Sequence, residues 1–233
     1  KISELPPGRQ PVKTYYSKGR FAEILRFCHN EINKGHQIYV VYPLIADSEK
    51  LDLASATAGF EEIKTFLPDV HVGLMHGQLL QEEKDRIMKK FKENKIQILV
   101  STTVIEVGVD VPNATVMVIM NSERFGLAQL HQLRGRIGRN QIQSFCFLVS
   151  KANSVESKQR IKAMLKTADG FELAEEDLRI RGPGDVLGNR QSGEQDFILA
   201  TLAGNKGYLK KVIESSDALI QEDSQLSNVG HEP

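Results

Sequence analysis

The chain has 233 residues, of which 40% are hydrophobic and 26% charged, and 30 lysines and arginines balance 30 aspartates and glutamates. This is the composition of a globular protein with a sizeable core, and the balanced charge argues against a basic coat that neutralises nucleic-acid phosphates over a broad surface. No apolar run approaches the roughly 18 residues that would span a bilayer, and Cys28 and Cys146 are too few for a disulfide scaffold, so we expect no membrane contact and a reducing compartment.

The first residues differ in composition from the rest of the chain. Three of the eight prolines lie within residues 1–14, and the chain does not begin with Met. Proline favours extended backbone and interrupts helices and sheets. We therefore interpret residues 1–16 as a linker from a missing upstream lobe, in a chain that is a piece of a longer protein.

Residues 17–150 alternate between two patterns. Apolar residues at helical spacing predict helices over residues 20–35, 55–67 and 79–94, the last with Leu80, Lys84, Ile87 and Phe91 along one stripe. Short apolar runs predict strands at residues 37–45, 70–75, 96–102, 115–121 and 144–150. This alternation predicts an α/β fold, an open and mainly parallel sheet with helices on both faces. In such sheets ligands bind beyond the carboxyl ends of the strands.

After Ser150 no further strand-like run appears. Residues 151–220 predict a helix, a turn, a second helix, a glycine-rich loop and a further helix, which together form a helical appendage to the sheet domain. Residues 221–233 are polar, and we expect a flexible tail.

Several catalytic motifs are absent from the sequence. It contains no glycine-rich phosphate loop with its lysine, so the chain is not a complete P-loop motor. No metal site is expected, because the acidic cluster of Glu172, Glu175, Glu176 and Asp177 lacks histidine partners and is typical of a solvated helix face.

The stretch QLHQLRGRIGR, residues 129–139, concentrates arginine and glycine. Arg136 and Arg139 are three residues apart, and on a helix they would project from one face. Guanidinium groups at that spacing suit the oxygens of a transferring phosphoryl group. The alternative is a solvated helix face with surface ion pairs. We interpret His131 as packed or exposed rather than catalytic.

Two turns upstream have the residue types of phosphate and ribose contacts. Gly108 permits an unusual backbone angle, and Asp110 could accept a hydrogen bond from a ribose hydroxyl. Residues 75–78, MHGQ, end a strand before a helix, where free backbone amides could bind a phosphate. Ordinary turns would explain both patterns equally well.

Together these stretches resemble the second RecA-like lobe of superfamily 2 helicases. Residues 101–112 resemble motif V, residues 132–139 resemble motif VI, and residues 74–91 resemble the segment that precedes them. Four further stretches are similar to the RecG family of branched-DNA helicases: residues 4–14, 41–52, 125–139 and 178–193. The transcription-repair coupling translocases are the nearest alternative, and a non-hydrolysing module that binds DNA or a partner is another.

The resemblance implies that ATP lies between two lobes, and that the upstream lobe holds the phosphates and Mg²⁺. Arg136 and Arg139 match the motif VI arginines, and Gln132 matches its glutamine. Gly108 and Asp110 match the part of motif V that faces the nucleotide. Thr102 and Gly77 match DNA-backbone contacts.

The resemblance also implies a role for the appendage. Arg160, Arg181 and Gln191 match residues that couple ATP hydrolysis to movement on duplex DNA. The implied partners are branched DNA, such as forks and Holliday junctions, and the upstream lobe and wedge domain of the same protein. A monomer in the cytoplasm of a bacterial-type cell is expected, and the piece should be inactive alone.

Overall fold

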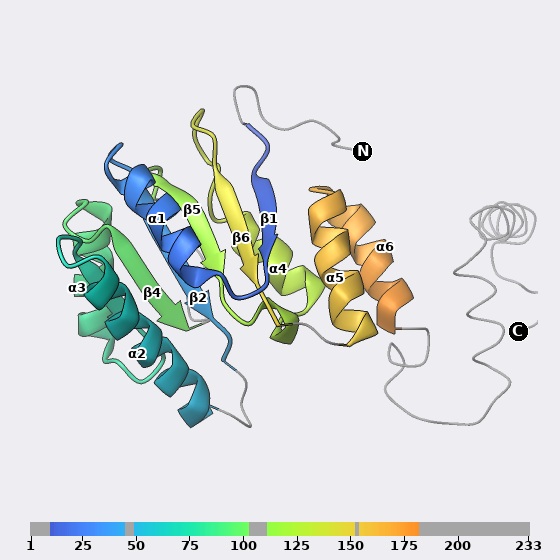
Figure 1. The fold of residues 1–233 in the computed structure, drawn as a ribbon, viewed down its shortest axis with the longest axis horizontal. Helices are drawn as coiled ribbons and strands as arrows, with labels where there is room; N and C mark the ends of the chain where they lie inside the picture. The colour runs from blue at the N-terminus through green and yellow to red at the C-terminus, as the bar shows by residue number, and fades with distance from the viewer. Residues whose placement is uncertain (1–9, 45–48, 103–110, 152–153, 182–233) are drawn as a thin grey trace, which may run out of the picture. The chain divides into compact units, whose positions relative to one another are not determined.

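The computed structural model describes residues 10–44, 49–102, 111–151 and 154–181. In this part of the chain six strands form one parallel sheet in the order β1-β6-β5-β2-β4-β3 (Figure 1). The strands are β1 (Lys13–Ser17), β2 (Gln37–Tyr42), β3 (Val72–Met75), β4 (Ile98–Thr102), β5 (Ala114–Ile119) and β6 (Phe145–Val149). We call the side where these strands begin the amino edge and the side where they end the carboxyl edge.

The three central strands are buried along their whole length, as their continuous apolar runs predict. Val40 of β2 pairs with Val100 of β4 and with Val118 of β5, so the three strands are in register and end together. β1 and β3 form the two ends of the sheet, and the exposed positions in β1 follow from that place.

Helices cover both faces of the sheet, which confirms the predicted fold class. α1 (Phe21–Ile32) and α2 (Glu49–Phe66) pack on the face that carries Ile38, Val40 and Val116. The opposite face carries Tyr39, Val41 and Met117, and the remaining helices contribute to its core (Figure 1). These are α3 (Gln81–Lys92), α4 (Leu127–Arg134), α5 (Val155–Lys166) and α6 (Gly170–Arg181).

Three local expectations differ from the structure. α2 begins at Glu49 rather than at residue 55. β1 lies largely within the segment expected to be a linker, because its backbone pairs with β6 from Lys13 onward. Leu80 is 72% exposed, since it precedes α3 in extended backbone, and the buried residues of that helix are Met88 and Phe91.

α5 and α6 form the hairpin that the sequence predicts after Ser150, and the compact unit that contains the sheet extends to Ile180. Ser154 caps α5, because its hydroxyl accepts a hydrogen bond from the Ser157 amide at 3.1 Å. The Asp169 carboxylate accepts from the Phe171 amide at 2.7 Å at the start of α6. None of the helices in the described ranges is long and apolar enough to cross a membrane.

Candidate functional site

Arg136 and Arg139 lie in a loop and not on a helix. α4 ends at Arg134, Gly135 caps it, and residues 135–144 form what we call the arginine loop. Gly138 has a φ of +69°, a left-handed conformation that interrupts any helix. The expectation that the two arginines share a helix face is therefore wrong, because the glycines between and before them end the helix.

The arginine loop is held at the amino edge of the sheet. Ile137 is fully buried in the core. The Asn140 side-chain amide donates to the Pro112 carbonyl at 2.5 Å, and the Gln143 amide donates to the Pro11 carbonyl at 2.8 Å. Because Pro112 precedes β5 and Pro11 precedes β1, both contacts lie where strands begin.

The three arginines of this stretch have different surroundings. Arg134 is 4% exposed, and its Nη1 donates to the carbonyls of Met164 at 2.9 Å and Thr167 at 3.0 Å. Arg136 is half-buried, and its guanidinium makes no hydrogen bond within the described part of the chain. Arg139 is exposed. Arg134 therefore joins α4 to the end of α5, whereas the guanidinium of Arg136 can donate hydrogen bonds to a ligand.

Arg134 is the residue that sequence reasoning missed. Burial lowers its pKa from the ordinary value, but its two acceptors lie in the last turn and cap of α5, where carbonyl groups lack helical partners and favour a cation. Three arginines within six positions look alike in sequence, and no signal there separates the buried one from the others.

Two other polar side chains of α4, Gln132 and His131, have different surroundings. Gln132 is exposed. His131 packs on the start of α6, where a methyl group added at Gly170 would lie 2.8 Å from the His131 Cε1. Burial, followed by the charge of Arg134, lowers the pKa of His131, so its neutral form is favoured. This is a packing position.

Gly77 and Thr102 lie near one another at one corner of the carboxyl edge. Met75 of β3 pairs with Ser101 of β4, and Gly77 and Thr102 come within two residues after this pair. Gly77 is exposed, and its carbonyl accepts from the Lys84 ammonium at 3.1 Å. Thr102 is fully buried, and its hydroxyl has no hydrogen-bond partner among the residues that the structure describes. The predicted DNA contacts are thus near one another and at the opposite edge from the arginine loop.

Arg160 connects α5 with the carboxyl edge. Its Nη2 lies 3.5 Å from the carbonyl of Glu123, in the short helix η2 (Ser122–Arg124) that follows β5. The next residue, Arg124, pairs in bidentate fashion with Asp52 of α2, which is 1% exposed. These two partners are 72 residues apart, so the sequence does not reveal the pair.

Four predicted residues cannot be compared with the structure at the level of their side chains. Gly108, Asp110 and Gln191 lie outside the described residues. Arg181 is the last residue of α6, and its side chain lies outside the description as well. Their assigned roles stay predictions.

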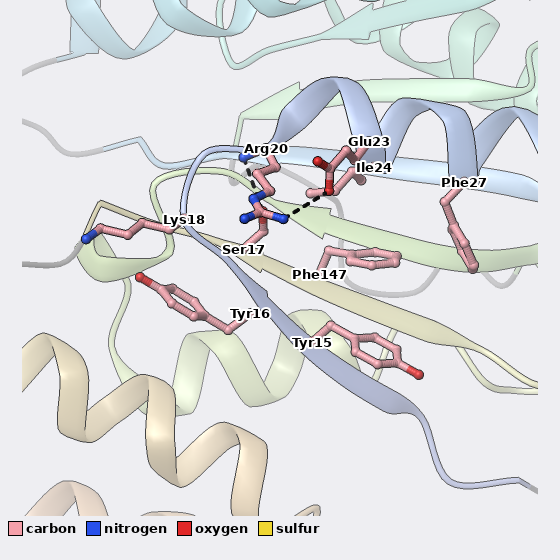
Figure 2. Close-up of a pocket in the computed structure, with 9 residues that line it drawn as sticks. All are labelled: Tyr15, Tyr16, Ser17, Lys18, Arg20, Glu23, Ile24, Phe27 and Phe147. Carbon is pink, nitrogen blue, oxygen red and sulfur yellow. Dashed lines mark hydrogen bonds and ion pairs between the residues drawn. The ribbon is translucent and has the colours of Figure 1, made fainter.

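A hollow of about 430 Å³ lies beside β1, away from these residues (Figure 2). The rings of Tyr15 and Phe147 stack along one wall, with centroids 5.5 Å apart. Arg20 and Glu23 form an ion pair at its rim, at 3.7 Å. None of the predicted site residues lines this hollow. Within the described ranges, no group of three or more His, Cys, Asp or Glu residues could hold a metal ion.

Comparisons with known proteins show the family to which this chain belongs. The helicase conserved C-terminal domain family matches residues 19–141, and the family described as ATP-dependent DNA helicase RecG, domain 3, C-terminal, matches residues 167–232. The ATP-dependent DNA helicase RecG of Synechocystis is 46% identical over 97% of this chain, and that of Streptococcus pneumoniae is 51% identical over 86%.

The chain spans only 27% and 30% of these two relatives, which is less than a third of their length. A solved structure of RecG bound to a three-way DNA junction is 45% identical, with a TM-score of 0.68 over 86% of this chain and 27% of that chain. The stretch that resembles motif VI, residues 132–139, lies within the first family match, and α6 lies within the second. The chain belongs to the helicase conserved C-terminal domain family, and it is similar in sequence to part of the RecG proteins.

Proposed function

We propose that the chain is the second motor lobe and coupling hairpin of an ATP-dependent DNA helicase that remodels branched DNA. One observation carries the proposal: the half-buried Arg136 guanidinium has no hydrogen-bond partner among the described residues, although the loop that carries it is fixed on several sides. A partly buried polar group is normally paired. An unpaired guanidinium on a braced loop fits a phosphoryl group that arrives with a bound nucleotide.

In this proposal ATP lies between the arginine loop and an upstream lobe joined through a linker within residues 1–16. Arg136 and Arg139 donate hydrogen bonds to the phosphoryl oxygens as negative charge spreads over them during hydrolysis. Gln132, one turn before Arg136, lies on the exposed side of α4 and would orient the nucleotide together with Gly108 and Asp110. Mg²⁺, held mainly by the upstream lobe, would neutralise phosphate charge.

The corner formed by Gly77 and Thr102 is proposed to contact the DNA backbone. Amide and hydroxyl contacts to phosphate position a strand without reading its bases. Recognition would therefore depend on the shape of a branch, such as a stalled fork or a Holliday junction, with the wedge domain of the same protein contributing. Because the Thr102 hydroxyl is buried, we expect this corner to rearrange when DNA binds.

The hairpin within residues 151–220 is proposed to couple the two sites. α5 touches the carboxyl edge through Arg160, and its last turn holds Arg134 directly before the arginine loop. A rigid helix in contact with both regions can transmit a movement of either one. Arg181 and Gln191 would extend the connection toward DNA. We place the lobe from β1, which begins at Lys13 rather than at the predicted residue 17, to residue 150, and the tail at 221–233, in a monomer that acts in the bacterial cytoplasm.

The test measures fork-stimulated ATP hydrolysis by the full-length protein that carries this chain. We expect Arg139→Ala and Arg136→Met each to lower kcat by about a thousandfold, which is the magnitude typical of an arginine finger. Arg26→Ala is the matched control, because Arg26 is an exposed arginine of α1 on the opposite face of the sheet. A full-length protein that hydrolyses ATP equally well with and without these two arginines would contradict the proposal.

Two further measurements separate the coupling role from the alternative of a binding module. Gln191→Ala should leave ATP hydrolysis nearly intact and abolish fork unwinding, and the chain alone should hydrolyse ATP negligibly. DNA binding by the full-length protein with no ATP hydrolysis at all would favour the binding module instead.

A further inference from the structure

Residues 11–13, at the start of β1, contact the arginine loop. The Pro11 carbonyl accepts a hydrogen bond from the Gln143 side chain at 2.8 Å, and the Lys13 amide donates to the Ser144 carbonyl at 2.9 Å. Between them, Val12 is partly buried against the core that contains Ile137. Residues 11–13 therefore form one wall against which the loop rests.

The tightest contact of this wall is between Val12 and Gly138. A Cβ atom added at Gly138 would lie 2.8 Å from the Val12 Cγ2, closer than real Cβ atoms approach another heavy atom, whereas the next neighbour, the Ser144 Cβ, would lie at 3.7 Å. Gly138 is buried and left-handed, and it directly precedes Arg139. The position of Val12 thus limits where the backbone between Arg136 and Arg139 can lie.

We propose that residues 11–13 are a positioning element for the arginine loop, with Val12 the positioning residue that holds Gly138 and, through it, Arg136 and Arg139 in place. The inference rests on the proposed function, since it assigns these arginines to phosphoryl transfer. Val12 itself touches no nucleotide. It acts because a side chain packed on the loop fixes the direction in which the arginines leave it.

The proposal gives the linker a mechanical role. Under the proposed function, residues 1–12 lead to the upstream lobe. A displacement of that lobe would then reach the arginine loop through Pro11 and Val12 directly, without passing through the sheet. Catalysis is sensitive to such shifts, because a misplacement of about 1 Å can cost about a hundredfold in rate.

The experiment is a double-mutant cycle on fork-stimulated ATP hydrolysis by the full-length protein. Val12→Ala should lower kcat by about tenfold and change KM for ATP by less than about twofold, and Val12→Ile should restore the rate. Gly138→Ala should lower kcat by about a hundredfold or more, because its methyl group meets Val12 and because alanine is strained in the left-handed backbone at this position. In that background the same Val12→Ala change should raise kcat by about tenfold, since it removes the clashing carbon atom.

Val72→Ala is the matched control, because Val72 is a partly buried valine on β3, at the other end of the sheet. It should not raise kcat in the Gly138→Ala background. If Gly138→Ala does not fold, the cycle is measured as the yield of folded protein, which Val12→Ala should restore and Val72→Ala should not.

Additive losses from Val12→Ala and Gly138→Ala would overturn the inference. A Val12→Ala protein whose loss lies only in KM would overturn it too. If Arg139→Ala abolishes hydrolysis while these effects are absent, the proposed function stands and the positioning role fails. If Arg139→Ala has no effect, the proposed function itself fails.

Discussion

The three arginines of residues 134–139 should respond to substitution in two different ways, and Arg134→Met is the sharpest case. This change replaces the guanidinium that joins α4 to the end of α5 with an apolar side chain of similar length. The change removes the donor that the carbonyls of Met164 and Thr167 accept from. Arg134 is only 4% exposed, so water has little access to replace that donor. We expect a large loss of folding stability.

The magnitude follows from the contacts. Each hydrogen bond from a charged donor contributes about 1.5 to 3 kcal/mol, and a cation near a helix C-terminus adds about 0.3 to 1 kcal/mol. The guanidinium also costs free energy to bury, as its lowered pKa indicates, and this offsets part of the gain. We expect a net loss of about 3 kcal/mol, which corresponds to a shift of about 1 M in the urea midpoint.

Urea unfolding of the chain, followed by circular dichroism, measures this loss. Arg134→Lys should lose about half as much, because an ammonium group is a point donor and cannot reproduce the planar geometry that reaches both carbonyls. Arg136→Met is the control, since its guanidinium has no hydrogen bond to lose within the described residues, and its stability should change by less than about 0.5 kcal/mol.

The two changes should affect ATP hydrolysis by the full-length protein in the opposite order. Arg136→Met should lower kcat by about a thousandfold without a loss of folding stability. Arg134→Met should lower hydrolysis only because less of the protein is folded. Equal losses of stability from Arg134→Met and Arg136→Met would refute this assignment. They would show that the hydrogen bonds from Arg134 to α5 do not contribute to folding stability.

Three further changes test other contacts. Arg124→Met should cost about 3 kcal/mol, because it leaves the buried Asp52 carboxylate without its bidentate partner, and the loss should persist at high salt; a loss that salt removes would identify an exposed pair instead. The lowered pKa of His131 means that the unfolded chain binds its proton more readily, so stability should fall as the pH drops below about 6.5 and level off below the folded-state pKa; His131→Gln should remove that part of the slope, and an unchanged slope would contradict it. Gly59→Ala places a methyl group 1.8 Å from the hydroxyl oxygen of the buried Tyr42 and should cost about 3 kcal/mol or more in urea unfolding, so a loss below about 1 kcal/mol would refute the tight contact.

Much of the fold follows from local pattern. The buried strands are short runs of β-branched and apolar residues, and a parallel sheet buried on both faces requires such runs in every central strand. Helix boundaries were less predictable. α2 starts at Glu49 although Asp52 lies in its first turns as a buried charge, and what makes that burial possible is Arg124, far along the chain. A local pattern carries no information about such a partner.

The candidate site shows the same division. Arg136 and Arg139 could be chosen from sequence because arginine and glycine are concentrated there, and Gln132 was implied by the resemblance to motif VI; the family match places this stretch in a helicase domain. The predicted helix through Arg136 and Arg139 is wrong, although Gly135 and Gly138 are of the residue type that commonly ends helices. The conformation of the loop, left-handed at Gly138 and packed against Val12, depends on residues far apart in the sequence.

The sequence by itself determined the class of fold and the family, and it supplied the residues that we propose for phosphate contact. The tertiary structure decided which arginine is buried against α5, which one makes no hydrogen bond to the described residues, and which edge of the sheet each group occupies. The physical reason is the range of the forces involved. Backbone propensity and hydrophobic periodicity act between near neighbours, whereas burial and hydrogen bonding of a charged side chain depend on groups that meet only after the chain has folded.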